Sequence, residues 1–174
     1  MGLYSFAPPR VIANRIKAGR LNKDWAVVDV RDSDFIGGHI PGCHHIPSEN
    51  FHERCKALID ELKDVKCVIF HCALSRESDS GSSKVTTGSK SALRDAHDET
   101  IAEQRGPTAA KLYAHRREDN LVSGSLKSLL PFGTEAQARG EAQEVMIVQG
   151  GFKEWAEEFK DDPALVEGYN PALW

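Results

Sequence analysis

Residues 66–72 read KCVIFHC, a short apolar run that ends in a histidine and a cysteine. Such a run of β-branched and aromatic residues predicts a strand that is buried on both faces. Two similar runs, WAVVDVR at 25–31 and EVMIV at 144–148, predict two further buried strands. Cys72 therefore lies at the carboxyl end of the second of three expected strands.

Helical spacing of apolar residues separates these strands. It predicts helices at 9–19, at 48–63 with Ser48 as the N-cap, and at 105–118, where Pro107 is tolerable only in the first turn. After the last strand, two glycines lead into another short helix. Strands that alternate with helices predict an α/β fold, with a mainly parallel sheet flanked by helices. Ligands of such sheets bind outside the carboxyl ends of the strands, where Cys72 falls.

Composition excludes several classes of function. The chain has 174 residues, which is the length of one domain, and its net charge of −4 with 7% aromatic residues argues against nucleic-acid binding. No apolar run is long enough for a membrane span, and the N-terminus lacks a secretory pattern. We therefore expect a cytoplasmic protein, with the nucleus as a second compartment, and we expect its four cysteines to be thiols.

A histidine-rich stretch raises the question of a metal site. His44, His45, His52 and Cys55 lie close together in the sequence. They show no paired CxxC or HxxxH spacing of the kind that zinc sites use. We expect no metal there.

Residues 76–102 differ in character from the rest of the chain. They contain no aromatic residue, many serines and threonines, and charges that nearly cancel. Such a segment cannot bury enough apolar surface to offset the entropy lost on ordering. We expect a disordered, mobile insertion within one domain that spans 1–174, with a weak helix around 91–101 as the alternative.

Position alone leaves two roles open for Cys72. One is a buried thiol of the core. The other is a thiolate nucleophile in a loop of backbone amides at a helix N-terminus, where the amides and the helix dipole favour an anion. Such a loop would also hold a phosphate or arsenate, and a following arginine would bind two of its oxygens.

Three stretches resemble the rhodanese-like domain. They are VVDVRDSDFIGGHIPG (27–42), VIFHCALS (68–75) with EQRGPTAAKLY (103–113), and VMIVQGGFKEW (145–155), which occur in that family's order. An HC-x5-RGP pattern is typical of the branch that holds the cell-division-cycle dual-specificity phosphatases and the fungal arsenate reductases. The resemblance implies a three-layer α/β fold.

The resemblance also implies roles for particular residues. Cys72 would be the nucleophile and Arg105 the phosphate-binding arginine. Asp29 and Arg31 are interpreted as a structural ion pair, His71 as a residue that fixes the loop, and His39 as part of the turn beneath the site. The anion-binding loop would comprise Ala73, Leu74, Ser75, Glu103, Gln104 and Gly106.

The sequence departs from this pattern at one point. Here 32 residues separate Cys72 from Arg105, and removal of 76–102 restores the five-residue spacing. The segment is either a retained intron of 27 codons or a genuine insertion, and both origins stay open. Since catalysis is sensitive to small displacements of a site, we expect the chain as written to have weak or no activity.

These observations lead to one main hypothesis of function. The chain would be a cysteine-dependent phosphatase or arsenate reductase that forms a phosphocysteine or a cysteine–arsenate adduct. It would need no metal or organic cofactor, although arsenate reduction would consume an external thiol such as glutathione. Its partner would be a phosphorylated protein or a small phosphate or arsenate oxyanion. The alternatives are a thiosulfate-type sulfurtransferase and an inactive rhodanese binding module.

Overall fold

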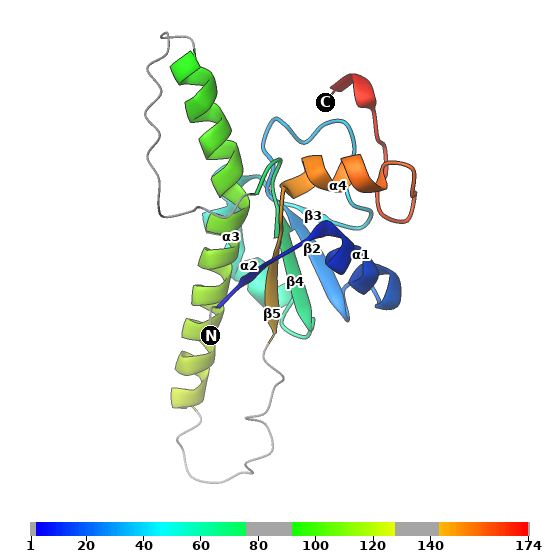
Figure 1. Cartoon of the computed structure of the whole chain (residues 1–174). Helices are drawn as coiled ribbons and strands as arrows, with labels where there is room; N and C mark the ends of the chain where they lie inside the picture. The colour runs from blue at the N-terminus through cyan, green and yellow to red at the C-terminus, as the bar shows by residue number, and fades with distance from the viewer. Residues whose placement is uncertain (1–2, 76–91, 128–142, 174) are drawn as a thin grey trace.

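The computed structural model describes residues 3–75, 92–127 and 143–173, and within 92–103 and 122–127 it describes the backbone alone (Figure 1). Five strands form a sheet in the order β1-β5-β4-β2-β3. Each pair of neighbouring strands is parallel. The predicted α/β fold with a mainly parallel sheet is therefore confirmed.

The three strands predicted from sequence form the centre of this sheet. Every residue of β2 and β4 is buried, as expected for strands covered on both faces. The two edge strands were not predicted, because two or three residues are too short to show a period. The strands are β1 (Ser5–Ala7), β2 (Trp25–Asp29), β3 (His44–His45), β4 (Cys67–His71) and β5 (Glu144–Val148).

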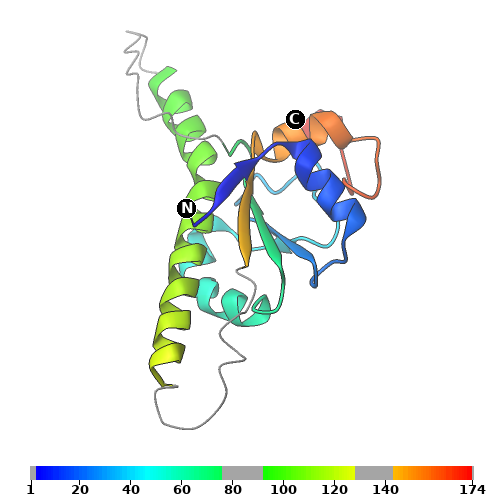
Figure 2. The ribbon, with the colours of Figure 1, turned by 60° about the horizontal axis from the view of Figure 1, so that its bottom comes forward.

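Helices cover both faces of the sheet and give the predicted three layers. Figures 1 and 2 show α1 and α4 on one face, with α2 and α3 on the other. Each face has its own apolar cluster: Ile12 and Trp155 belong to one, Phe51 and Tyr113 to the other. The helices are α1 (Pro9–Ala18), α2 (Ser48–Glu61), α3 (Ala92–Lys127) and α4 (Gly151–Phe159), followed by a 3-10 turn at Pro171–Leu173.

The predicted N-cap of α2 is wrong. Pro47 takes the N-cap position, and Ser48 is the first helical residue. The Ser48 hydroxyl instead donates a hydrogen bond to the Asp32 carboxylate at 2.6 Å. The Ser48 hydroxyl thus binds a residue outside the helix, whereas the local sequence pattern predicts a hydrogen bond with the backbone of the helix itself.

Helix α3 is much longer than the predicted helix at 105–118. Pro107 lies inside it rather than in its first turn, and Figure 1 shows the helix extending beyond the sheet at both ends. Although α3 is long, no helix in the described part of the chain is also apolar enough to cross a membrane. The sequence pattern located the segment that packs, because the described buried residues of α3 are Gly106, Ala109, Ala110, Tyr113 and Ala114.

The insertion predicted at 76–102 lies partly outside the described residues, which stop at Ser75 and resume at Ala92. From Ala92 onward the backbone is helical, and the disordered insertion over 76–102 stays a prediction. The alternative of a helix around 91–101 agrees with the structure there. One domain over 1–174 stays a prediction.

The sheet register brings the polar ends of two strands together. Strand β2 pairs with β4 so that Asp29 lies opposite His71, at the carboxyl ends of both strands. Cys72 follows directly, and the carboxyl end of β5 leads into the glycines before α4. The topology therefore gathers Asp29, Cys72 and the start of α4 at one edge.

Candidate active site

Cys72 lies immediately after β4, at the carboxyl edge of the sheet, as the sequence predicted. Its side chain is completely buried. None of the four cysteines forms a disulfide. The described form of the protein therefore holds a reduced sulfur at the expected place but covers it.

Ser75 surrounds the sulfur with polar groups. The Ser75 hydroxyl oxygen accepts a hydrogen bond from the Cys72 amide at 3.0 Å, and it lies 3.0 Å from Cys72 Sγ. Because that oxygen already accepts from the amide, its own proton can be directed at the sulfur. The Ser75 amide also donates to Sγ at 3.4 Å. Two donors directed at the sulfur are suited to stabilising a thiolate.

The first turn of α4 holds the chain just after the cysteine. The Phe152 amide donates to the Cys72 carbonyl at 2.8 Å, and the Lys153 amide donates to the Ala73 carbonyl at 3.0 Å. The first amides of a helix have no partner within the helix. Here the loop carbonyls supply those partners, so the helix and the loop are fixed to each other.

Gly106 of α3 covers the cysteine from the opposite helical layer. A Cβ atom at this position would lie 2.5 Å from Ser75 Oγ, 3.2 Å from the Cys72 amide nitrogen and 3.4 Å from Cys72 Sγ. Only glycine allows the helix to approach this closely. The structure thus brings Gly106 to Cys72 across the insertion, as the predicted loop requires.

Arg105, the predicted phosphate-binding residue, pairs with two carboxylates. Its Nη1 donates to Asp32 at 2.9 Å and to Asp34 at 2.8 Å, and its Nη2 donates to Asp34 at 2.5 Å. Its Nε is buried and has no hydrogen-bond partner among the described residues. In this form the guanidinium therefore binds Asp32 and Asp34, and the Nε donor has no partner among the described residues.

The pKa values of this group follow from the pairing. Burial lowers the pKa of Arg105, but the hydrogen bonds that it donates to Asp34 and Asp32 outweigh this effect, with further contributions from the charges of Asp34 and Cys72, so the pKa is raised. Burial alone would raise the pKa of Asp32, yet hydrogen bonds from Ser48 and Arg105 hold it below its usual range. Both partners are therefore charged.

The predicted ion pair between Asp29 and Arg31 lies beside His71, the residue that precedes Cys72. Both side chains are fully buried, with Nη2 of Arg31 2.7 Å from Asp29 Oδ2. Arg31 also donates to the Gly38 carbonyl at 2.9 Å and lies over the Phe152 ring. Burial tends to raise the pKa of Asp29, but His71 and Arg31 lower it.

His71 is fully buried between this pair and the loop. Its Nδ1 lies 3.3 Å from the Cys72 carbonyl, and a carbonyl can only accept, so that hydrogen bond needs the proton on Nδ1. Burial lowers the pKa of His71, although Asp29 opposes the shift. The described contacts agree with the predicted role of fixing the loop.

His39 lies in the loop between β2 and β3, and its predicted role in a turn beneath the site stays a prediction. Its amide donates to the Glu167 carbonyl at 2.9 Å, and the Glu167 amide donates back at 2.8 Å. These bonds tie the loop to the C-terminal segment. The described contacts of His39 are therefore with that segment.

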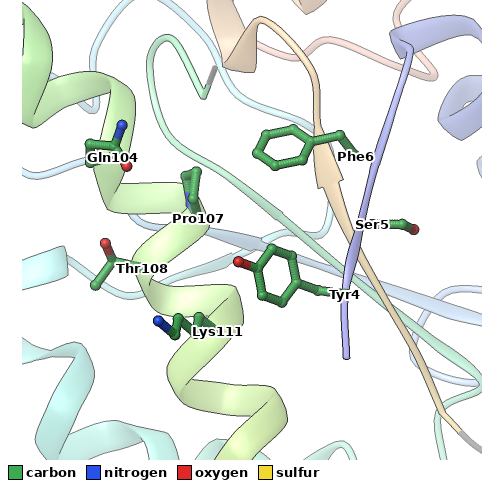
Figure 3. Close-up of a pocket in the computed structure, with 7 residues that line it drawn as sticks. All are labelled: Tyr4, Ser5, Phe6, Gln104, Pro107, Thr108 and Lys111. Carbon is green, nitrogen blue, oxygen red and sulfur yellow. The ribbon is translucent and has the colours of Figure 1, made fainter. Parts of the chain in front are cut away.

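Gln104 lies on the side of α3 that faces the N-terminal strand. It lines a pocket of about 610 Å³ between α3 and the N-terminal strand (Figure 3). Figure 3 shows the rings of Tyr4 and Phe6 facing α3, with Ser5 turned away. The side chain of Glu103 lies outside the described residues. Of the three loop residues predicted beyond the insertion, Gly106 is the one whose approach to Cys72 the structure describes.

Asp32 and Asp34 were not predicted from the sequence as partners of the site. A signal existed, because both lie in the loop that follows the end of β2, at the edge where ligands bind. Nothing in their spacing indicates Arg105, which is more than seventy residues away in the chain. As for metal ions, the described residues contain no cluster of three or more histidine, cysteine or carboxylate side chains that could hold one.

Comparisons with known proteins agree with this architecture. The family model of the rhodanese-like domain matches residues 12–97. The arsenate reductase 2.2 of Oryza sativa subsp. japonica is 28% identical over 131 residues, which cover 75% of this chain and 68% of the relative. The CDC25-like phosphatase YCH1 of Saccharomyces cerevisiae is 29% identical over 154 residues, which cover 88% of this chain and 80% of the phosphatase.

Solved structures of similar proteins share the fold of this chain. Ygr203w, a yeast protein tyrosine phosphatase of the rhodanese family, has a TM-score of 0.60 and 25% identity, covering 100% of this chain and 99% of its own. An As-Sb reductase from Leishmania major shares the fold, with a TM-score of 0.52 and 21% identity. The match covers 98% of this chain and 90% of the reductase.

Proposed function

Because the chain contains a rhodanese-like domain, we propose that it is a cysteine-dependent enzyme that acts on phosphate esters or on arsenate. The observation that carries this proposal is the Cys72 thiol after β4, with two donors from Ser75 directed at its sulfur. Relatives that are phosphatases and arsenate reductases support it over the sulfurtransferase alternative.

In the phosphatase reaction, the Cys72 thiolate would attack phosphorus in line with the ester oxygen. The S–P bond forms as the P–O bond breaks, and the electron pair leaves with the alcohol oxygen, which takes a proton. Water then attacks the phosphocysteine, releases phosphate and restores the thiolate. Arg105 and the loop amides would stabilise the charge on the other phosphate oxygens.

With arsenate, the same thiolate would displace hydroxide or water from arsenic and form a cysteine–arsenate adduct. A thiolate of an external thiol such as glutathione would then attack the Cys72 sulfur, so that an S–S bond forms as the S–As bond breaks and its electron pair stays on arsenic, which leaves as arsenite, As(III). A second molecule of the thiol would resolve this mixed disulfide, which restores the Cys72 thiolate and releases the external thiol as its disulfide. The relatives that are arsenate reductases support this second activity. Both activities need the same residues.

The proposed reaction requires a rearrangement of the described form. Arg105 would have to exchange at least part of its pairing with Asp32 and Asp34 for the oxyanion. The sulfur would have to become accessible beside Gly106. Together with the insertion at 76–102, these contacts give a reason to expect low activity in the chain as written.

The test is a set of three assays on the full chain and on the Cys72→Ser variant. They measure hydrolysis of p-nitrophenyl phosphate, reduction of arsenate with glutathione, and sulfur transfer from thiosulfate to cyanide. Phosphate hydrolysis or arsenate reduction that requires Cys72 would support the proposal. Cyanide-dependent sulfur transfer without the other activities would replace it with the sulfurtransferase.

Inactivity of the full chain and of a chain lacking 76–102 in all three assays would favour an inactive binding module. We further propose that the reaction needs no metal or organic cofactor, which is tested by adding chelator to an active sample. The proposed location is the cytoplasm or the nucleus, and microscopy of the tagged full chain tests it.

A further inference from the structure

We propose that Gly151 is a positioning residue that sets the direction of two amide groups in the oxyanion-binding loop after Cys72. The inference rests on the proposed function and assigns a role to the start of α4. It follows from the orientation of the loop carbonyls. Gly151 itself would touch neither substrate nor the reacting sulfur.

The first step is the orientation of two peptide groups. The Cys72 and Ala73 carbonyls both point at α4, because they accept from the Phe152 and Lys153 amides. The structure contains no cis peptide bond among its described residues. In a trans peptide the N–H points away from the carbonyl. The amides of Ala73 and Leu74 therefore point away from α4.

The second step is that these two amides have no hydrogen-bond partner in the described part of the chain. Neither the Ala73 amide nor the Leu74 amide donates a hydrogen bond to any residue that the structure describes. Buried or half-buried amides are normally paired, and consecutive amides that are left open form anion-binding sites. The next amide in the chain, that of Ser75, points at Cys72 Sγ. Three successive amides are thus available to the sulfur and to an oxyanion bound to it.

The third step is why residue 151 must be glycine. Its φ is +61°, a conformation that other residues rarely adopt. A Cβ atom there would lie 2.5 Å from the Ala73 carbonyl oxygen and 2.6 Å from that of Cys72. Both neighbours are backbone atoms of the loop, so a side chain would push or rotate the two peptide groups that carry the open amides.

The contact also adds an electrostatic effect. The N-terminus of a helix carries partial positive charge. In α4 the amides of Phe152 and Lys153 direct that charge at the two loop carbonyls rather than at the anion. Hydrogen bonds in a chain polarise one another, so each loop amide becomes a stronger donor. The helix would thereby act on the oxyanion through the peptide groups between them.

The test compares Gly151→Ala with Gly168→Ala in the full chain. Gly168 is a matched control, because its φ is +67° and a Cβ atom there would meet nothing within 4 Å. Inorganic phosphate is titrated into each protein while the backbone amides are followed by NMR, and turnover of p-nitrophenyl phosphate is measured alongside. Thermal unfolding of both variants measures the strain that they share.

We expect phosphate to shift the Ala73 and Leu74 amides of the wild-type chain. Gly151→Ala should weaken phosphate binding about tenfold or more, since hydrogen bonds to a charged group are lost, whereas Gly168→Ala should bind like the wild type. Unchanged phosphate affinity in Gly151→Ala would overturn the inference. The inference would also be overturned if the wild-type chain bound phosphate and the NMR signals of the Ala73 and Leu74 amides did not shift. This second measurement does not depend on the folding of the variant. A wild-type chain that does not bind phosphate would overturn the inference alone, because the proposed function is decided separately by the three assays on the full chain and on the chain lacking 76–102.

Discussion

The guanidinium of Arg105 is joined to the carboxylate of Asp34 by two hydrogen bonds, Nη1 to Oδ1 at 2.8 Å and Nη2 to Oδ2 at 2.5 Å. Two parallel N–H groups binding two oxygens is the geometry by which arginine also binds phosphate. Asp34 therefore occupies the donors that a substrate oxyanion would need.

The first prediction concerns this competition. Asp34→Asn should lower the KM for p-nitrophenyl phosphate about tenfold, because the loss of one charge weakens the internal partner of Arg105. The kcat should change little. Initial rates over a range of substrate concentrations measure both. If Asp34 instead orients Arg105 for catalysis, the same variant will raise KM or reduce kcat.

The second prediction concerns the insertion. Deletion of residues 76–102 joins Ser75 to Glu103 and restores the spacing of five residues between Cys72 and Arg105. Turnover of a phosphate ester should rise about 100-fold, since a displacement of about 1 Å in a site can cost that factor. Rates of the two chains at equal concentration provide the measurement. Equal turnover would show that the insertion does not limit catalysis.

The third prediction concerns the buried pair below the site. Arg31→Met leaves Asp29 charged and buried without its partner, and should cost about 3–5 kcal/mol of unfolding free energy. Urea denaturation measures the loss. Arg20→Met is the control, because Arg20 and Asp24 form an exposed pair whose removal should change stability little. Equal effects of the two substitutions would contradict this account of the pair.

The fourth prediction concerns pH. Burial gives His71 a lower pKa in the folded protein than in the unfolded chain, where it is about 6.5. The unfolded chain therefore binds the proton more readily, and stability is lost as pH falls below about 6.5, by up to about 1.4 kcal/mol per pH unit. His71→Gln should remove this slope.

Urea denaturation between about pH 7.5 and about pH 5.5 provides the test of the fourth prediction, because these values lie about one unit on either side of the unfolded pKa. His115→Gln, which changes an exposed histidine on α3, should leave the slope as it is. A slope that persists in His71→Gln would assign the pH dependence to other groups.

The sequence predicted the centre of the fold because β2, β4 and β5 are short apolar runs, and burial on both faces leaves that pattern directly in the chain. It also placed Cys72 correctly, since position after a strand is a local property. The ends of α3 could not be predicted in the same way. Pro107 indicates a helix start by local propensity, whereas the structure continues the helix through it.

Tertiary pairing accounts for what the sequence could not predict in the candidate site. Asp34 and Arg105 lie far apart in the chain, and no periodic pattern relates them. Ser48 has the residue type of an N-cap, but its hydroxyl binds Asp32. Gly150 and Gly151 were predicted to form a turn, while the contact of Gly151 with the loop after Cys72 depends on the packing of one element against another.

The strand order has a consequence for synthesis of the chain. Strand β4 lies between β2 and β5 in the sheet, yet β5 is translated long after β4. During that interval one edge of CVIFH lacks its neighbour, and an open apolar edge is prone to pair with other chains. At about 5–20 residues per second, the 27 residues of the insertion prolong the interval by about 1–5 s. The segment between β4 and β5 therefore affects how long each nascent chain is exposed to aggregation.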